Sequence, residues 1–98
     1  METLHLEYPA TAPARQRVLV GVVASGDLEI LIEPATAGRT QITIHATGSL
    51  SPDLWRKQLD RLFAHGAAAA MHMEINAFGA TPGVISLRLA QAMEEVGT

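Results

Sequence analysis

Polar and apolar residues alternate along four stretches of the chain. The stretches cover residues 4–8, 28–33, 40–46 and 71–76. A period of two places successive side chains on opposite faces of an extended strand, so each stretch predicts a strand with one buried and one exposed face. In the third stretch, for example, we expect Ile42 and Ile44 to face the core, and Thr43 and His45 to face solvent.

A fifth strand is predicted from residues 17–24, which are apolar on both faces. Such a strand is either central in a sheet or has one face against another protein. Ser25, Gly26 and Asp27 then interrupt the apolar run, and the alternating stretch 28–33 follows. Two strands around a short glycine-containing break form a β-hairpin. We therefore expect Ser25 at or beside the hairpin tip, exposed to solvent.

Two helices are predicted, and each begins with a hydroxyl residue followed by proline. Ser51 and Thr81 are placed to cap the two helices, with Pro52 and Pro82 in the first turns. Gly66 is expected to end the first helix in the left-handed conformation. Helical spacing predicts buried stripes of Trp55, Leu59, Leu62 and Phe63 in the first helix, and of Ile85, Leu89, Ala92, Met93 and Val96 in the second.

The remaining segments predict connections. Residues 9–13 contain two prolines, and Pro34 is expected to close the strand before it. The resulting order is β-β-β-β-α-β-α. Because the helices are amphipathic and most strands have one apolar face, we predict an α+β fold: a two-layer sandwich of a mainly antiparallel sheet of about five strands and two helices. The 98 residues are expected to form one domain.

Composition removes several classes of protein. A net charge of −3 without a basic run argues against nucleic-acid binding. The absence of cysteine excludes a disulfide framework and a thiolate metal site. The N-terminus is acidic and alternating, unlike a signal peptide, and no apolar run approaches membrane-spanning length. We therefore expect a cytoplasmic protein that is not bound to a membrane. Only 17% of the residues are charged, which leaves surface for a protein partner.

No group of residues in the sequence forms an active site of its own. The four histidines, His5, His45, His65 and His72, stand apart, whereas a metal site needs two or three ligands on one face. His72 and Glu74 share a strand face, but such a pair on an open sheet is usually solvated. We predict neither catalytic nor metal-ligating residues, which leaves a binding module, a structural subunit or a carrier.

By pattern alone, Ser25 is a turn serine and Asp27 a turn aspartate. The segment Ser-Gly-Asp-Leu-Glu-Ile-Leu-Ile-Glu-Pro at residues 25–34, however, resembles the prosthetic-group segment of the malonate decarboxylase acyl carrier (delta) subunits. The related citrate lyase acyl carrier (gamma) chain also has Ser-Gly-Asp before an alternating strand. The segment Phe-Gly-Ala-Thr-Pro-Gly-Val at residues 78–84 favours the malonate family, and the resemblance extends over nearly the whole chain.

This resemblance implies a covalently attached cofactor. In the family, the serine hydroxyl carries 2'-(5''-phosphoribosyl)-3'-dephospho-CoA through a phosphodiester, so Ser25 would be the attachment point. Gly26 would leave room for a transferase to approach, and Asp27 would either hold the turn, the role that we favour, or position the hydroxyl. The thiol of the arm would hold acetyl and malonyl thioesters during the decarboxylation of malonate to acetate and CO2. Because cofactors usually do the difficult chemistry, the chain would be a non-catalytic carrier.

The partners implied by the resemblance are the transferase and decarboxylase subunits of malonate decarboxylase, and the transferase that attaches the arm. Three alternatives remain. The first is a citrate lyase acyl carrier. The second is an adaptor without any modification, which would equally lack an active site. The third is a hydrolase with Ser25 as nucleophile, which we disfavour because no Gly-x-Ser-x-Gly elbow surrounds it.

Overall fold

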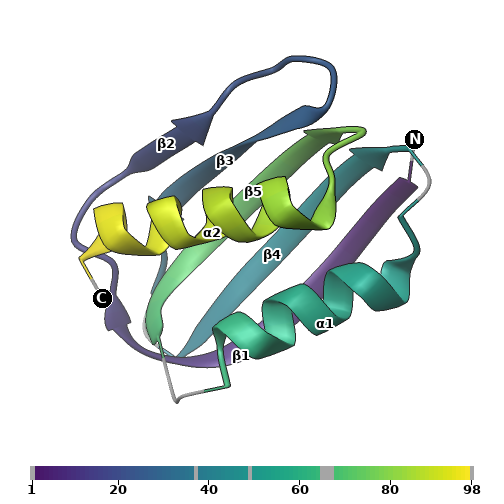
Figure 1. Cartoon of the computed structure of the whole chain (residues 1–98). Helices are drawn as coiled ribbons and strands as arrows, with labels where there is room; N and C mark the ends of the chain where they lie inside the picture. The colour runs from purple at the N-terminus through teal and green to yellow at the C-terminus, as the bar shows by residue number, and fades with distance from the viewer. Residues whose placement is uncertain (1, 37, 49, 65–67, 98) are drawn as a thin grey trace.

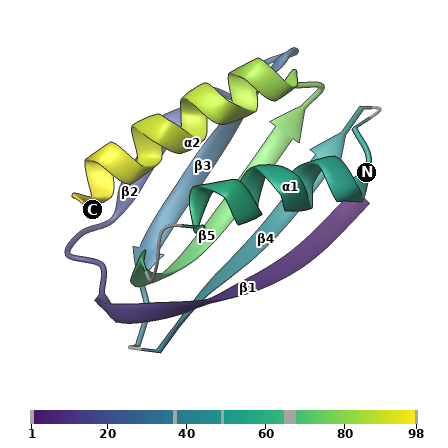
Figure 2. The same ribbon diagram turned by 60° about the horizontal axis from the view of Figure 1, so that its bottom comes forward.

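The computed structural model describes residues 2–36, 38–48, 50–64 and 68–97. In chain order its elements are β1 (Glu2–Pro13), β2 (Val18–Gly21), β3 (Asp27–Pro34), β4 (Arg39–Thr47), α1 (Pro52–Leu62), β5 (Ala68–Phe78) and α2 (Pro82–Val96). The predicted order β-β-β-β-α-β-α and the α+β class are confirmed. Both helices lie on the same face of the sheet, so the second face is open (Figures 1 and 2).

The five strands form one sheet in the order β1-β4-β5-β3-β2. The pairs β1–β4, β3–β5 and β2–β3 are antiparallel, as predicted for most of the sheet. The central pair β4–β5 is parallel, which makes the sheet mixed. Parallel neighbours need a long crossover connection, and α1 supplies it. The hairpin β2–β3 occupies one side of the sheet and is covered by α2 (Figure 1).

The core lies between the sheet and the two helices. The alternating strands bury the faces that were predicted to point to the core. Ile42 and Ile44, for example, are each only 1% exposed. Trp55 and Leu59 form the buried stripe of α1, while Leu62 and Phe63 are partly buried and pack against the core. The buried stripe of α2 comprises Ile85, Leu89, Ala92 and Val96, with Met93 partly buried beside it. Each fully buried isoleucine, leucine or valine contributes about 1.5–3 kcal/mol by leaving water.

Both helix starts have the predicted caps. The hydroxyl of Ser51 accepts a hydrogen bond from the backbone N–H of Leu54, and that of Thr81 accepts one from Val84, each at 3.3 Å. A proline follows each cap within the first turn. Gly66, predicted to end the first helix, and His65 lie outside the described residues. The caps therefore fix where both helices begin, from residues that were recognisable in the sequence.

The prediction of a connection at residues 9–13 is wrong, because β1 continues to Pro13. Pro9 pairs with Arg39 of β4, and Pro13 then pairs with Ala70 of β5. Proline lacks an N–H and is therefore tolerated on a strand at the edge of a sheet, where one side needs no donor. Strand β1 occupies that edge position over most of its length, and this position was not visible in the sequence.

The expectation of a central strand at residues 17–24 is also wrong. Strand β2 is an edge strand of four residues that ends at Gly21. Its two apolar faces have different surroundings: Val18 is buried on the helix side, whereas Leu19 is 63% exposed on the open side. The other explanation for a strand that is apolar on both faces, contact with a second protein, stays a prediction.

None of the helices in the described part of the chain is long and apolar enough to cross a membrane. The cytoplasmic location stays a prediction.

Candidate functional site

Residues 22–26 form the turn that joins β2 to β3, and Ser25 is exposed there. We call residues 22–26 the tip turn. Backbone hydrogen bonds hold it: the N–H of Val22 donates to the carbonyl of Leu28 at 3.1 Å, and that of Asp27 donates to Ala24 at 3.0 Å. Within the described structure no side chain forms a hydrogen bond with the hydroxyl of Ser25, and the residue is exposed to solvent.

The tip turn is also tied to the neighbouring strand. The N–H of Gly26 donates to the carbonyl of Phe78, at the end of β5, with a donor–acceptor distance of 2.6 Å. Phe78 and Thr47 line a shallow hollow of about 330 Å³ beside Ser25, together with Val23 and Ala24. Ser25 therefore stands over the ends of β4 and β5, at one end of the sheet.

Two glycines at the hairpin serve different purposes. Gly21 has φ +86°, and a Cβ built there would lie 2.0 Å from the carbonyl oxygen of Leu28, so only glycine fits. Gly26 has φ +79°, but nothing lies within 4 Å of a Cβ built on it. Gly21 permits the close approach of the two strands, whereas Gly26 permits the turn and leaves open space next to Ser25.

Asp27 is bound from two directions. The guanidinium of Arg88 on α2 donates through Nε to Oδ1 at 3.0 Å and through Nη2 to Oδ2 at 2.7 Å. The backbone N–H of Leu28 donates to Oδ1 at 2.7 Å. The hydrogen bonds from Arg88, and then the one from Leu28, hold the pKa of Asp27 below its usual value, so this carboxylate is charged at neutral pH.

The three predicted site residues are consecutive in the chain, and the structure places them at the hairpin tip. Ser25 and Gly26 lie in the tip turn, and Asp27 is the first residue of β3. The contacts of Asp27 favour the turn-holding role over direct positioning of the hydroxyl. Arg88 was missed as a member of the site. A weak signal existed, since no acidic residue stands one turn away on either side of it in α2, at residues 84, 85, 91 and 92.

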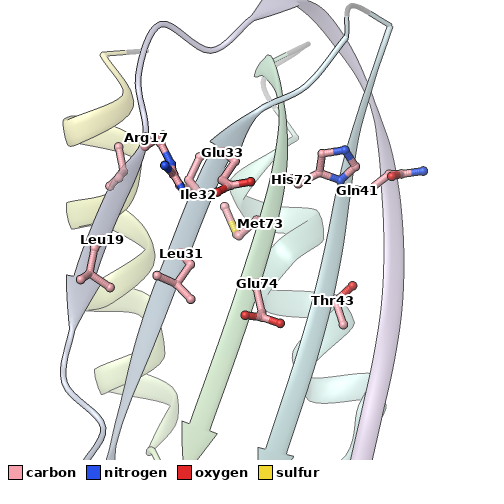
Figure 3. Close-up of a pocket in the computed structure, with 11 residues that line it drawn as sticks. Arg17, Leu19, Leu31, Ile32, Glu33, Gln41, Thr43, His72, Met73 and Glu74 are labelled. Atoms are coloured by element: carbon pink, nitrogen blue, oxygen red, sulfur yellow. Dashed lines mark hydrogen bonds and ion pairs between the residues drawn. The ribbon is translucent and has the colours of Figure 1, made fainter.

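The open face of the sheet carries most of the histidines that were considered as metal ligands. The strand register places Leu19, Leu31, Glu74 and Thr43 in one row across β2, β3, β5 and β4 (Figure 3). This row crosses a broad hollow of about 640 Å³ that His72 also lines. Along this row the side chains change from apolar at β2 and β3 to polar at β5 and β4, so the face is not uniform.

Two of the histidines on this face contact polar neighbours, and His45 has two such contacts, one of which joins its Nδ1 to the hydroxyl of Thr3 at 3.3 Å. His45 Nε2 lies 3.5 Å from a carboxylate oxygen of Glu74, and His5 Nδ1 lies 3.2 Å from the hydroxyl of Thr43. Across the described residues, no group of three or more histidine or acidic side chains is arranged to hold a metal ion. The open face therefore offers a surface for contact. The candidate reactive group at the tip turn is the hydroxyl of Ser25.

The fold and site define a class of protein: a small α+β domain that presents a turn serine at one end of an open-faced sheet. Comparison with known proteins gives the family. Residues 15–96 match the family model of the malonate decarboxylase delta subunit (MdcD). The chain therefore belongs to the family of malonate decarboxylase acyl carrier (delta) subunits, and the resemblance noted in the sequence is confirmed.

Individual relatives agree over the full length. The malonate decarboxylase acyl carrier protein of Azotobacter vinelandii is 52% identical over 96 residues, covering 98% of this chain and 97% of its own. The protein of the same name from Pseudomonas aeruginosa is 50% identical over 97 residues, covering 99% and 98%. A chain in the crystal structure of a Pseudomonas malonate decarboxylase hetero-tetramer in complex with malonate superposes with a TM-score of 0.94. It is 46% identical and covers 99% of this chain and 100% of that one.

Proposed function

We propose that this chain is the acyl carrier subunit of a malonate decarboxylase, and that the hydroxyl of Ser25 is the attachment point for 2'-(5''-phosphoribosyl)-3'-dephospho-CoA. The observation that carries the proposal is the position of Ser25, which is exposed in the turn at a hairpin tip. The family membership of the chain supports the same assignment.

The residues around Ser25 fit such a group. An arm with negative phosphates must stay in water or meet a basic partner surface, and the exposed tip turn allows both. The open space at Gly26 leaves the hydroxyl accessible from that side. Arg88 compensates the charge of Asp27, which reduces the repulsion between this carboxylate and a phosphate attached two residues away.

The thiol at the end of the bound arm would supply the attachment of acyl groups. The chain itself would hold the arm at a fixed anchor and keep the attached group at a high effective concentration near the partner subunits. Its residues bind and orient, and we assign the chemistry of decarboxylation to those subunits. The chain is accordingly proposed to be a carrier, without catalytic residues of its own.

Mass spectrometry of the intact protein from its native host tests the proposal. We expect an added mass of several hundred daltons on the peptide with Ser25, as for a nucleotide-linked cofactor arm. The variant Ser25→Ala should lack this mass. Ser86→Ala, which removes an exposed serine from α2, is the matched control and should retain it. An unmodified wild-type chain from cells that modify their other carriers would instead support an adaptor.

We further propose that partner subunits dock at the hairpin side of the molecule. The large hydrophobic side chains that are more than half exposed in the described structure are Leu19, Val22, Val23 and Leu87. Three of them belong to β2 or the tip turn, and the fourth lies on α2, which packs over that hairpin. Exposed apolar side chains of this kind mark a protein contact, and Val22 and Val23 adjoin Ser25 in the tip turn.

Charged substitutions test this docking surface. Val23→Glu and Leu31→Glu should each weaken co-purification of the transferase and decarboxylase subunits, about tenfold or more in affinity, because a buried charge is costly in an apolar contact. Ala64→Glu, at an exposed position after α1 and away from the hairpin, is the control and should leave binding unchanged. Full binding of all partners by both hairpin variants would place the interface elsewhere.

A further inference from the structure

We propose that Arg88 is the positioning residue of the carrier site: through its two-point contact with Asp27 it fixes the orientation of the tip turn, and so of the Ser25 hydroxyl, for the enzyme that attaches the arm. This inference rests on the proposed function, since it concerns the attachment at Ser25. It assigns a task to a residue of α2 that lies 61 positions from Asp27 in the chain.

The contact between Arg88 and Asp27 has a defined geometry. Both oxygens of Asp27 receive a nitrogen of the same guanidinium, at 3.0 and 2.7 Å. A pair with two parallel hydrogen bonds fixes direction as well as distance, which a single contact does not. Both side chains are 22% exposed, so the pair is partly shielded from water and salt. The start of β3, two residues after Ser25, is therefore held at a defined angle to α2.

The platform from which Arg88 reaches is rigid. Ile85 and Leu89 flank it in α2 and are 1% and 2% exposed, so the helix is packed firmly against the sheet at this point. Gln91 accepts a further hydrogen bond from Nη1 of Arg88 at 3.1 Å. Gln91 thus holds one of the three guanidinium nitrogens independently of Asp27, so less freedom remains for the guanidinium to lose when it binds Asp27.

The tip turn itself lacks the packing that normally fixes a loop. Val22 and Val23 are 52% and 61% exposed, and Ser25 is exposed as well. Polar contacts must therefore hold the turn: the N–H of Gly26 binds Phe78 of β5, and Asp27 binds Arg88 of α2. These two contacts join the hairpin end to two different elements and thereby restrict its rotation.

Asp27 is already occupied by these contacts, which argues against a direct role for it as a base toward Ser25. Its oxygens accept hydrogen bonds from Arg88 and from the N–H of Leu28. The same donors hold its pKa low, which makes it a poor acceptor of a proton. Its effect on Ser25 is therefore indirect, through the shape of the turn.

The test measures arm attachment and turn mobility together. For Arg88→Gln we expect kcat of arm attachment to fall about 10- to 100-fold, as a misplaced nucleophile does, with KM within about twofold of wild type. Hydrogen exchange of the Gly26 amide should become faster. Arg39→Gln removes the exposed ion pair between Arg39 and Glu7 and is the matched control; it should change neither quantity.

Two more variants separate positioning from charge. Arg88→Lys keeps the charge but not the two-point contact, so it should resemble Arg88→Gln more than the wild type. In the double variant Asp27→Asn/Arg88→Gln no uncompensated carboxylate remains, and attachment should stay slow. Full recovery in either variant would show that charge compensation suffices, and would overturn the positioning role.

The outcomes also separate this inference from the proposed function. Normal attachment in Arg88→Gln, together with its loss in Ser25→Ala, would overturn only the role of Arg88. Attachment to Ser25→Ala would overturn the carrier site itself. Should Arg88→Gln not fold, Asp27→Asn breaks the same pair from the other side and carries the same expectation for kcat and for exchange at Gly26.

Discussion

The two helices have the same construction but different attachments to the sheet. Each begins with a hydroxyl cap and a proline, and each buries an apolar stripe on the same face. On the side of α1, the hydroxyl of Tyr8 in β1 donates to Asp60 at 2.6 Å, and its ring stacks on Phe63 with centroids 4.6 Å apart. On the side of α2, Arg88 reaches the end of the hairpin and binds Asp27.

The two attachments therefore differ in what they can affect: the contact of Tyr8 bears on stability alone, and that of Arg88 also bears on the candidate site. The contacts of Tyr8 join a helix to an edge strand, where no candidate site lies. The contact of Arg88 joins a helix to the residue that follows the tip turn. Both polar attachments hold a helix against the sheet, and only the second also orients the hydroxyl that we propose to be modified. We therefore expect substitutions in the two halves of the molecule to affect stability and the tip turn differently.

The largest effect on stability is expected from substitutions that leave a cavity between a helix and the sheet. Leu59→Ala in α1 and Leu89→Ala in α2 remove side chains that are 0% and 2% exposed. Each should lower the free energy of unfolding by about 2–5 kcal/mol, measured by chemical denaturation. Under native conditions, only Leu89→Ala should also speed hydrogen exchange at Gly26 beyond the change in global stability, because it loosens the helix that holds Arg88.

Equal acceleration of exchange at Gly26 in both leucine variants, after correction for global unfolding, would contradict this expectation. The hairpin end would then be coupled to the whole core and not to α2 in particular. The two substitutions are matched in residue type and burial, so a difference between them reports position.

A smaller effect is expected from pH, and in opposite directions for the two halves. Burial, and then the hydrogen bond to Asp60, raises the pKa of Tyr8 above its ordinary value of 10.0. A raised pKa in the folded state means that stability is present below pH 10 and is lost as pH rises above it. The pKa of Asp27 is lowered from 3.8, so its contribution is present above that pH and is lost as pH falls.

Matched variants isolate the two groups. Wild type should exceed Tyr8→Phe in free energy of unfolding by about 1–2 kcal/mol at neutral pH, and the difference should shrink above pH 10. Since Tyr8 is the chain's single tyrosine, no other tyrosine contributes. The difference between wild type and Asp27→Asn should shrink below pH 3.8. If both differences in the free energy of unfolding stayed constant with pH, neither contact would persist in solution.

Much of the local structure was predictable from the sequence. Alternation identified the buried faces of β3, β4 and β5, and the hydroxyl-proline pairs at Ser51 and Thr81 identified both helix starts. The hairpin prediction placed Ser25 in an exposed turn. These features depend on the period of the chain and on the chemistry of turns and caps, which act over a few residues.

Only the tertiary structure decided how these elements are arranged and which distant residues meet. It placed β2 at an edge, extended β1 through two prolines, made β4 and β5 parallel, and brought Arg88 to Asp27. Strand order and contacts between residues 61 positions apart depend on how whole faces pack. The sequence by itself therefore indicated the serine and its turn, while the residue that holds the turn became visible only when α2 was packed over the hairpin.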